Sequence, residues 1–312
     1  MRIAAIDIGT VTTRLLVADV TAKGVREVER STDITHLGEG LTASGRLSEP
    51  AMQRVADVIA RYASRIEVLG VERTTAYATS ASRDAENAEY FVELLAASGA
   101  KPEIVTGSTE ARLAFTGATY ELEGEGILVA DLGGGSTELV LGDVTLEDGA
   151  RARDIEASRS IDVGSKRVTE LFLASDPPTQ LELEEARAFV AHELRPYFDA
   201  LRSKPRIAVA LAGTATTLSA IKQELATYDP DLVHHSCLAG SDLSDMLDML
   251  AALPLEKRKD VSGLDPGRAP VIVAGTLILE TVVGMAGLDS TLVSEHDILY
   301  GMLLETYADA LQ

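Results

Sequence analysis

The chain has 312 residues, of which 46% are hydrophobic, so it can build about two domains of ordinary size. Its formal net charge of −21 argues against nucleic acid as a partner, because a phosphate backbone requires a basic face on the protein. The single cysteine, Cys237, excludes an internal disulfide and a cysteine metal cluster, and no apolar run approaches the roughly 18 residues of a membrane span. The chain enters a strand at once without a signal-peptide pattern, so we expect a cytoplasmic protein that does not bind a membrane.

The first part of the chain predicts strands mixed with helices, an order typical of an α/β layer domain. Ser48 is a helix N-cap, and apolar residues follow it at helical spacing from Met52 onward. The polar, glycine-broken segment Thr32–Arg46 before it is expected to be a loop. Strands are expected at Ile3–Ile8, Arg14–Val20, Val25–Arg30, Glu72–Ala78 and Pro102–Val105, and helices after Ser48, from Thr79 to Ala97 and after Gly107.

The second part of the chain repeats this plan. Strands are expected at Ile127–Asp131, Glu138–Leu141, Ala152–Ser158, Ile207–Leu211 and Thr291–Val293, and helices at Val163–Phe172, Leu181–Leu201, from Gly213, Asp242–Leu253, Pro266–Gly287 and Glu295–Leu311. The glycine-rich segment Glu123–Gly126 is the expected boundary, which gives domains at 1–125 and 126–312. The last helix is a candidate to pack back on the first domain.

The most informative stretch is Val129–Gly142, where an apolar run leads to Asp131, three glycines and a second apolar run. This pattern is typical of a β-hairpin with a glycine tip. Consecutive glycines leave backbone N–H groups unshielded, so the tip can wrap an anion. An anion beside a carboxylate is usually explained by a divalent cation between them. The alternative is an ordinary hairpin with a flexible tip, and a Walker loop is excluded because no lysine follows the glycines.

A second copy of this hairpin begins the chain. Asp7–Val20 aligns without gaps on Asp131–Val144, which matches Asp7 with Asp131 and Gly9 with Gly133. Two equivalent hairpins suggest a duplicated domain. Two such domains facing each other would bring two anion loops and two carboxylates into one cleft. Chance similarity between two hairpins is the alternative.

Two further stretches and one arginine carry candidate chemistry. Gly213–Thr217 follows an apolar strand and begins a helix, where free N–H groups favour a phosphate, although alone a plain N-cap explains it better. Glu110 lies in the first turn of a helix, where a carboxylate is also merely stabilising. Arg83, near another helix start, becomes a phosphate clamp if phosphate loops lie close to it.

Histidine chemistry is not favoured by the sequence. The adjacent pair His234 and His235 suggests a metal site, but no third ligand stands at metal-site spacing, so a surface loop is expected. The chain has no Gly-x-Ser-x-Gly nucleophile motif. Carboxylates and glycines must therefore carry any chemistry.

Together these stretches resemble the exopolyphosphatase and guanosine pentaphosphate phosphatase (Ppx/GppA) family in its short two-domain form. The resemblance covers nearly the whole chain and rests on Ile6–Thr10, Leu37–Leu41, Ala78–Arg83, Gly107–Arg112, Asp131–Glu138, Gly164–Arg167, Gly213–Thr217 and Arg268–Ala269. That family belongs to the superfamily of actin-like proteins, sugar kinases and heat-shock-chaperone ATPases. The resemblance implies an α/β fold of duplicated actin-like ATPase (ribonuclease H-like) domains flanking a central cleft.

The same resemblance implies Mg²⁺-dependent hydrolysis of a terminal phosphoanhydride bond, with Mn²⁺ as an alternative metal. It implies that Glu110 orients or deprotonates the attacking water, that Asp131 and Glu138 are further catalytic acids, and that Asp131 and Asp7 lie at the metal. The residues implied in phosphate binding are Gly9, Thr10, Thr12, Arg83, Gly133, Gly134, Gly135, Ser136, Gly213 and Thr214. This set agrees with the chemistry, because phosphoryl transfer needs mainly positioning and charge neutralisation.

The chain also departs from the family pattern. Val11 stands where the family often has Asn, His36 where it often has Arg, and Ile298–Tyr300 where many members have Leu-Arg-Glu. These changes make the site less polar or less basic, and the chain ends at Gln312 without the additional C-terminal helical domains of longer members. We therefore expect inorganic polyphosphate of short chain length as the substrate, and family analogy implies a homodimer.

Three alternatives remain open. Guanosine pentaphosphate or a nucleoside triphosphate could be hydrolysed at the same site, since all these substrates share a terminal phosphate. A non-catalytic sensor of polyphosphate or an alarmone is favoured slightly by Val11, but a pure anion binder gains nothing from Glu110, Asp131 and Glu138. A sugar kinase or chaperone ATPase would need an adenosine pocket and an acceptor base, for which the sequence gives no distinct signal.

Overall fold

The computed structural model, described here for residues 1–147 and 150–311, divides the chain into two compact units. Unit 1 comprises Met1–Gly117 and Ile298–Gln312, and unit 2 comprises Ala118–Asp297. The division falls eight residues before the expected Gly126, and the final helix belongs to the first unit. Within the described residues, no helix combines the length and the apolar character needed to cross a membrane.

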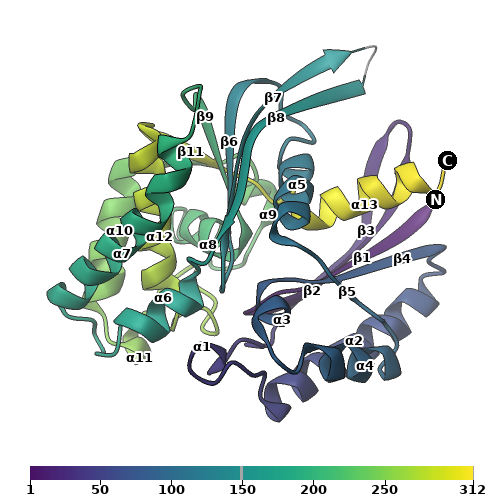
Figure 1. Ribbon diagram of the computed structural model, residues 1–312, viewed down its shortest axis with the longest axis horizontal. Helices are drawn as coiled ribbons and strands as arrows, with labels where there is room; N and C mark the ends of the chain where they lie inside the picture. The colour runs from purple at the N-terminus through teal and green to yellow at the C-terminus, as the bar shows by residue number, and fades with distance from the viewer. Residues whose placement is uncertain (148–149, 312) are drawn as a thin grey trace. The chain divides into compact units, whose positions relative to one another are not determined.

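Unit 1 is built on a sheet with the strand order β3-β2-β1-β4-β5 (Figure 1). The three N-terminal strands form an antiparallel meander, and β4 and β5 then add in parallel to β1. Its elements are β1 (Arg2–Ile8), β2 (Thr12–Thr21), β3 (Gly24–Ile34), α1 (Leu41–Ser44), α2 (Glu49–Val68), β4 (Arg73–Ala78), α3 (Ser80–Asp84), α4 (Ala88–Ala97), β5 (Glu103–Ile104), α5 (Gly107–Ala118) and α13 (Ile298–Asp309).

Unit 2 repeats this order as β8-β7-β6-β9-β11 and adds β10 at the edge. Again an antiparallel meander is followed by strands that pair in parallel, β9 with β6 and β11 with β9. Its elements are β6 (Gly124–Leu132), β7 (Thr137–Glu147), β8 (Ala150–Ile161), α6 (Ser165–Phe172), α7 (Gln180–Asp199), β9 (Ile207–Leu211), α8 (Ala212–Lys222), α9 (Pro230–Val233), β10 (Cys237–Ala239), α10 (Gly240–Ala252), α11 (Leu255–Arg258), α12 (Ile272–Ala286) and β11 (Ser290–Val293). The duplicated α/β fold predicted from the two hairpins is confirmed.

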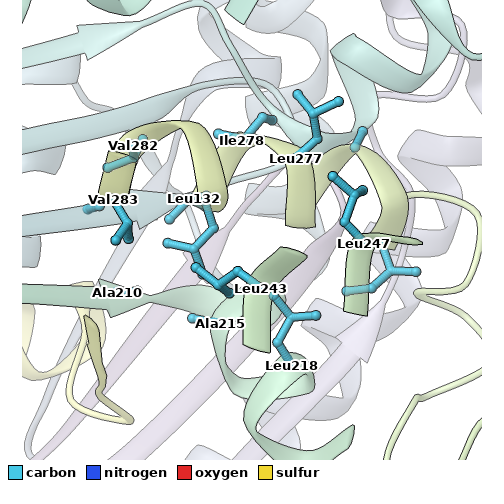
Figure 2. Close-up of a cluster of buried hydrophobic side chains, with 14 of the residues drawn as sticks. Leu132, Ala210, Ala215, Leu218, Leu243, Leu247, Leu277, Ile278, Val282 and Val283 are labelled. Carbon is cyan, nitrogen blue, oxygen red and sulfur yellow. The ribbon is translucent and has the colours of Figure 1, made fainter. Parts of the chain in front are cut away.

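The hydrophobic cores explain which strand positions are left for polar side chains. In unit 1, Ala4, Ile6 and Ile8 of β1 pack with the apolar faces of α2 and α4. In unit 2, even-numbered positions of β6 pack with α7, α8, α10 and α12, and Figure 2 shows this cluster around α12. Because side chains alternate across a strand, Asp7 and Asp131 lie on the opposite face of their sheets.

Two predicted helices are shorter than their sequence patterns indicate. The segment expected as one helix from Thr79 to Ala97 breaks between α3 and α4, where Asn87 accepts a hydrogen bond from the Leu47 amide and donates one to the Leu47 carbonyl, each at 2.9 Å. The helix expected from Pro266 begins only at Ile272. Pro270 lacks an N–H group, and turns precede the helix there.

Gly301 of α13 allows that helix to pack closely on α5 within unit 1. A Cβ atom at Gly301 would lie 2.1 Å from the Leu113 carbonyl oxygen, and a backbone atom cannot move aside cheaply. We expect Gly301→Ala to lower the free energy of unfolding by about 1–3 kcal/mol or more through overpacking. Differential scanning calorimetry would report this as a fall in Tm of roughly 2–4 °C per kcal/mol.

The matched control is Gly284→Ala in α12, where an added Cβ meets no atom within 4 Å. This change should stabilise the protein by about 0.5–1 kcal/mol, because alanine has the higher helix propensity. Equal effects of the two substitutions would contradict the close contact at Gly301.

Candidate functional site

In unit 1, polar segments gather where three parallel strands end. The amide of Thr79 donates to the Ile8 carbonyl at 3.2 Å, and the amide of Val105 donates to the Ala78 carbonyl at 3.1 Å. The segments that follow β1, β4 and β5 therefore leave the sheet at the same edge. The carboxyl ends of parallel strands are where α/β sheets bind their ligands. This edge brings together the sequence-predicted Gly9 loop, Arg83 and Glu110.

Asp7 is neutralised by a partner on the neighbouring strand. It stands opposite Arg14 in the β1–β2 register, and Arg14 Nη2 lies 2.6 Å from Asp7 Oδ2. Both side chains are largely shielded from solvent, with exposed fractions of 14% for Arg14 and 6% for Asp7. A charge-assisted pair in such surroundings is held more firmly than one in water.

Glu110 is a buried carboxylate in the first turn of α5. Arg83 Nη1, from the last turn of α3, lies 2.6 Å from Glu110 Oε2 and also donates to the Val105 carbonyl at 3.1 Å. Burial raises the pKa of Glu110 above its usual 4.5, and the charge of Arg83 opposes this rise. Asp7 raises the pKa of Glu110 further and Arg14 lowers it, so the two ion pairs act on each other. A carboxyl group with a raised pKa is better matched to accept a proton near neutral pH.

The loop between β1 and β2 is braced by the Leu-Gly-Glu-Gly segment. Gly9 donates to the Thr12 carbonyl at 2.8 Å and closes the turn, and Gly38 donates to the Thr10 carbonyl at 2.9 Å. A Cβ atom at Gly38 would stand 2.4 Å from Thr10 Cγ2, so the Thr10 side chain would have to shift if another residue replaced this glycine. The motif that carried part of the family resemblance thus supports the first loop.

In unit 2, carbonyl groups of the glycine tip between β6 and β7 accept hydrogen bonds from the start of α6. Gly133 donates to the Ser136 carbonyl at 3.0 Å, which closes the turn. Its own carbonyl accepts from the Ser165 amide at 3.0 Å, and the Gly134 carbonyl accepts from the Lys166 amide at 2.8 Å. The start of α6 therefore holds the tip by its oxygens and orients the peptide groups.

Two backbone amides of this tip remain available to bind a ligand. Within residues 1–147 and 150–311, the N–H groups of Gly134 and Gly135 donate to no protein group. None of the three glycines has a positive φ, so a left-handed backbone is not the reason for them. Close approach accounts for Gly133, where a Cβ would lie 3.0 Å from the Ser136 carbonyl oxygen, and for Gly164 of the supporting segment, where a Cβ would lie 2.4 Å from the Gly134 carbonyl carbon. Adjacent free N–H groups on a fixed turn are an anion-binding concavity.

Asp131 and Glu138 are directly opposed carboxylates beside this tip. They are paired in the β6–β7 register, and both are buried, with exposed fractions of 7% and 1%. Glu138 Oε1 accepts hydrogen bonds from Ser136 Oγ at 2.9 Å and from Ser160 Oγ at 2.6 Å. Like charges directly opposite each other destabilise a strand pair, so a cation between them would be stabilising.

A third turn lies next to the glycine tip. Asp131 is paired with Leu211 across the parallel strands β6 and β9, so the turn at Gly213 leaves the sheet beside the β6–β7 turn. Ala212 has a φ of 63°, and Arg268 Nη1 donates to the Gly213 carbonyl at 2.6 Å and to Thr217 Oγ1 at 3.0 Å. Arg268 therefore fixes this turn at the start of α8.

The donor set around each aspartate decides where a divalent metal fits. Asp131 and Glu138 offer carboxylate oxygens, the ligand atoms that Mg²⁺ prefers. At the equivalent place in unit 1, the guanidinium of Arg14 already supplies the positive charge to Asp7. The residues of unit 2 fit a metal, whereas at Asp7 a metal would compete with Arg14.

The pair His234 and His235 has a candidate third ligand that sequence spacing does not show. Glu121, distant in sequence, offers a carboxylate oxygen within 4.8 Å of a ring nitrogen of each histidine. No local spacing could reveal this group, because the chain returns to the place only after more than a hundred residues.

Comparison with known proteins places these features in one family. The model of the Ppx/GppA phosphatase family matches residues 16–306. The chain is 41% identical to Exopolyphosphatase 2 of Mycobacterium tuberculosis strain H37Rv over 323 aligned residues, which cover 97% of this chain and 98% of that protein.

Two solved structures are similar over the whole chain. A crystal structure of an exopolyphosphatase-like protein has a TM-score of 0.92 at 33% identity and covers 100% of this chain and 99% of that chain. The Aquifex aeolicus member of the Ppx/GppA protein family has a TM-score of 0.82 at 31% identity, with the same coverage.

The raised pKa of Glu110 predicts how its charge affects stability. Since the folded protein binds this proton more tightly than the unfolded chain, stability falls as pH rises from the usual carboxyl range through the raised pKa. Glu110→Gln mimics the protonated form and removes this loss. We expect its Tm to exceed that of the wild type at neutral pH and to equal it at about pH 4, where both side chains are neutral.

The control for this experiment is Glu93→Gln, which changes an exposed glutamate in the middle of α4 and should leave Tm nearly unchanged at both pH values. If Glu110→Gln instead lowered Tm at neutral pH, the ion pair with Arg83 would outweigh the burial of the carboxylate.

Proposed function

The chain belongs to the Ppx/GppA phosphatase family, and on this premise we propose that it is an exopolyphosphatase. It would hydrolyse the terminal phosphoanhydride bond of inorganic polyphosphate and release orthophosphate. The proposal is supported by the relative named Exopolyphosphatase 2, which matches along nearly its full length. It also agrees with the glycine tip and the acidic pair of unit 2 and with the buried Glu110 of unit 1.

The observation that carries the proposal is the glycine tip of unit 2 with its two opposed carboxylates. Free amides at Gly134 and Gly135 suit the oxygens of a phosphate, and Asp131 with Glu138 suits Mg²⁺, with Mn²⁺ as the alternative. A metal held there would supply charge neutralisation to a phosphoanhydride. An anion site and an acidic pair only three or four residues apart are difficult to explain without such a cation.

Glu110 of unit 1 is the proposed general base. Its buried environment raises its pKa, and the Arg83 ion pair fixes which oxygen faces the protein, leaving the other to take a proton from water. A base that acts on water favours hydrolysis over transfer to an acceptor. It also separates this proposal from a sensor, since binding an anion gains nothing from a buried acid.

The alternative substrates belong to the same class of phosphoanhydrides. Guanosine pentaphosphate and nucleoside triphosphates present the same terminal phosphate, so they remain the alternative substrates. Arg83 as a phosphate contact, a preference for short chains, a homodimer and a cytoplasmic location all stay predictions from the sequence and the family.

The direct test is orthophosphate release with Mg²⁺ from short polyphosphate, long polyphosphate, guanosine pentaphosphate and ATP. We expect release from polyphosphate, and a loss of about 10²–10⁴-fold in kcat for Glu110→Gln with substrate binding retained. Binding of all four substrates without any release would instead favour the sensor. Activity of Glu110→Gln near that of the wild type would remove Glu110 from the mechanism.

The metal assignment has its own test, the Mg²⁺ concentration that gives half-maximal activity. Asp131→Asn should raise this concentration by at least about tenfold, since it removes one of two charged ligands. The matched control is Asp143→Asn on the neighbouring strand β7, where the side chain accepts a hydrogen bond from the Gly126 amide at 2.7 Å. Asparagine keeps that acceptor, so the control should keep the Mg²⁺ dependence of the wild type.

A further inference from the structure

A cluster of three histidines and one glutamate in unit 2 has no part in the chemistry above. Glu121 lies between α5 and β6, His234 and His235 follow α9, and His296 follows β11. His234 Nε2 is 3.2 Å from Glu121 Oε2, and His296 Nδ1 is 3.8 Å from the same oxygen. The rings of His234 and His235 are stacked at 3.8 Å, and those of His234 and His296 are 4.2 Å apart.

The distances within this cluster match those between ligands of one metal ion. Glu121, His234 and His235 each offer a ligand atom, and these atoms lie within 4.8 Å of one another. In a tetrahedral site with bonds of about 2.0–2.1 Å, neighbouring ligand atoms are about 3.3 Å apart. The 3.2 Å between His234 Nε2 and Glu121 Oε2 is already that separation.

We propose that Glu121, His234 and His235, with His296 beside them, form a binding site for a divalent transition-metal ion of the zinc class. Imidazole nitrogens with one carboxylate suit Zn²⁺, Co²⁺ or Ni²⁺, whereas Mg²⁺ prefers a set of oxygens. The cluster is thus distinct in chemistry from the acidic pair at Asp131. Glu121 and His235 are exposed enough for an ion to enter from solvent.

The backbone around the cluster is fixed from several sides. His235 has a φ of 58°, a conformation that is rare for a residue with a side chain, and its amide donates to the Val293 carbonyl at 2.7 Å. Val293 in turn donates to the Ser236 carbonyl at 2.8 Å. The loop after α9 is therefore joined to the end of β11, which leads directly to His296.

Metal binding requires one hydrogen bond to change. The amide of Glu295 donates to His234 Nδ1 at 3.1 Å, which places the proton of a neutral ring on Nε2, facing Glu121. A metal on Nε2 requires the proton on Nδ1, so the Glu295 amide must release the ring. The Glu295 amide is therefore a local reporter of the ion that does not depend on enzymatic activity.

The location suggests what the ion would do. The chain passes from unit 1 to unit 2 between Gly117 and Ala118 and returns between Asp297 and Ile298. Glu121 and His296 lie just inside unit 2 at these two connections. An ion shared by the cluster would fasten both connecting segments to the loop after α9.

The test is binding of Co²⁺, followed by its visible absorption and by calorimetry, in the presence of saturating Mg²⁺ to occupy oxygen-rich sites. We expect one Co²⁺ per chain with a d–d spectrum typical of nitrogen ligation. His235→Ala and Glu121→Gln should each weaken Co²⁺ binding by at least about 10–100-fold. Loss of a residue that only hydrogen-bonds to a metal ligand already lowers metal affinity by that factor. His192→Ala, an exposed histidine on α7, is the control and should bind as the wild type does.

Hydrogen exchange supplies a second measurement on the same proteins. Co²⁺ should slow amide exchange in 118–123 and 234–236 of the wild type, change exchange at Glu295, and have neither effect in Glu121→Gln. Glu121 is exposed and glutamine has its shape, so that variant should fold. No stoichiometric binding by the wild type, or binding unchanged in both cluster variants, would overturn the proposal.

Discussion

The cross-strand partner of the aspartate before each hairpin turn sets the chemistry of each unit. The two hairpins share the same strand pairing, the same face of the sheet and the same aspartate, yet Asp7 is opposed by Arg14 and Asp131 by Glu138. Side chains directly opposite each other on neighbouring strands attract when their charges are opposite and repel when their charges are alike. The first hairpin therefore pairs opposite charges, whereas the second places two carboxylates opposite each other. The residue opposite the aspartate, an arginine in one unit and a glutamate in the other, is what distinguishes the two hairpins electrostatically.

Glycine serves these sites mainly by letting backbone segments approach each other. Gly38 approaches Thr10, and Gly164 approaches the carbonyl of Gly134, each at distances that exclude a Cβ atom. Both contacts come from motifs outside the loops that they support. Neighbouring segments thus hold the turns in place, so their amides have a fixed direction before a ligand binds. Ordering these turns therefore costs little free energy on binding.

Much of the fold, and the hairpin that carries the aspartate in each unit, could be predicted from local pattern. The strand–turn–strand signature, the aspartate and the N-cap at Ser48 depend on neighbours in sequence, and they are where we expected them. The break before α4 was missed because it depends on Asn87 bonding to Leu47, forty residues away. Arg83 and Glu110 were both expected at the site, but their ion pair was not, and neither was Glu121 beside the histidine pair, since tertiary contacts leave no periodic trace in sequence.

Besides Asp7, unit 1 carries a second buried acid, Glu110. With Asp7 bound to Arg14, the carboxylate of the first hairpin is not a free base. Glu110, buried on α5, has its pKa raised by that burial, while Arg83 opposes the rise. The pair at Asp7 and Arg14 acts on the pKa of Glu110 in opposite directions, since Asp7 raises it and Arg14 lowers it. A duplicated fold has thus kept the same scaffold twice, while the charged residues on its two hairpins differ.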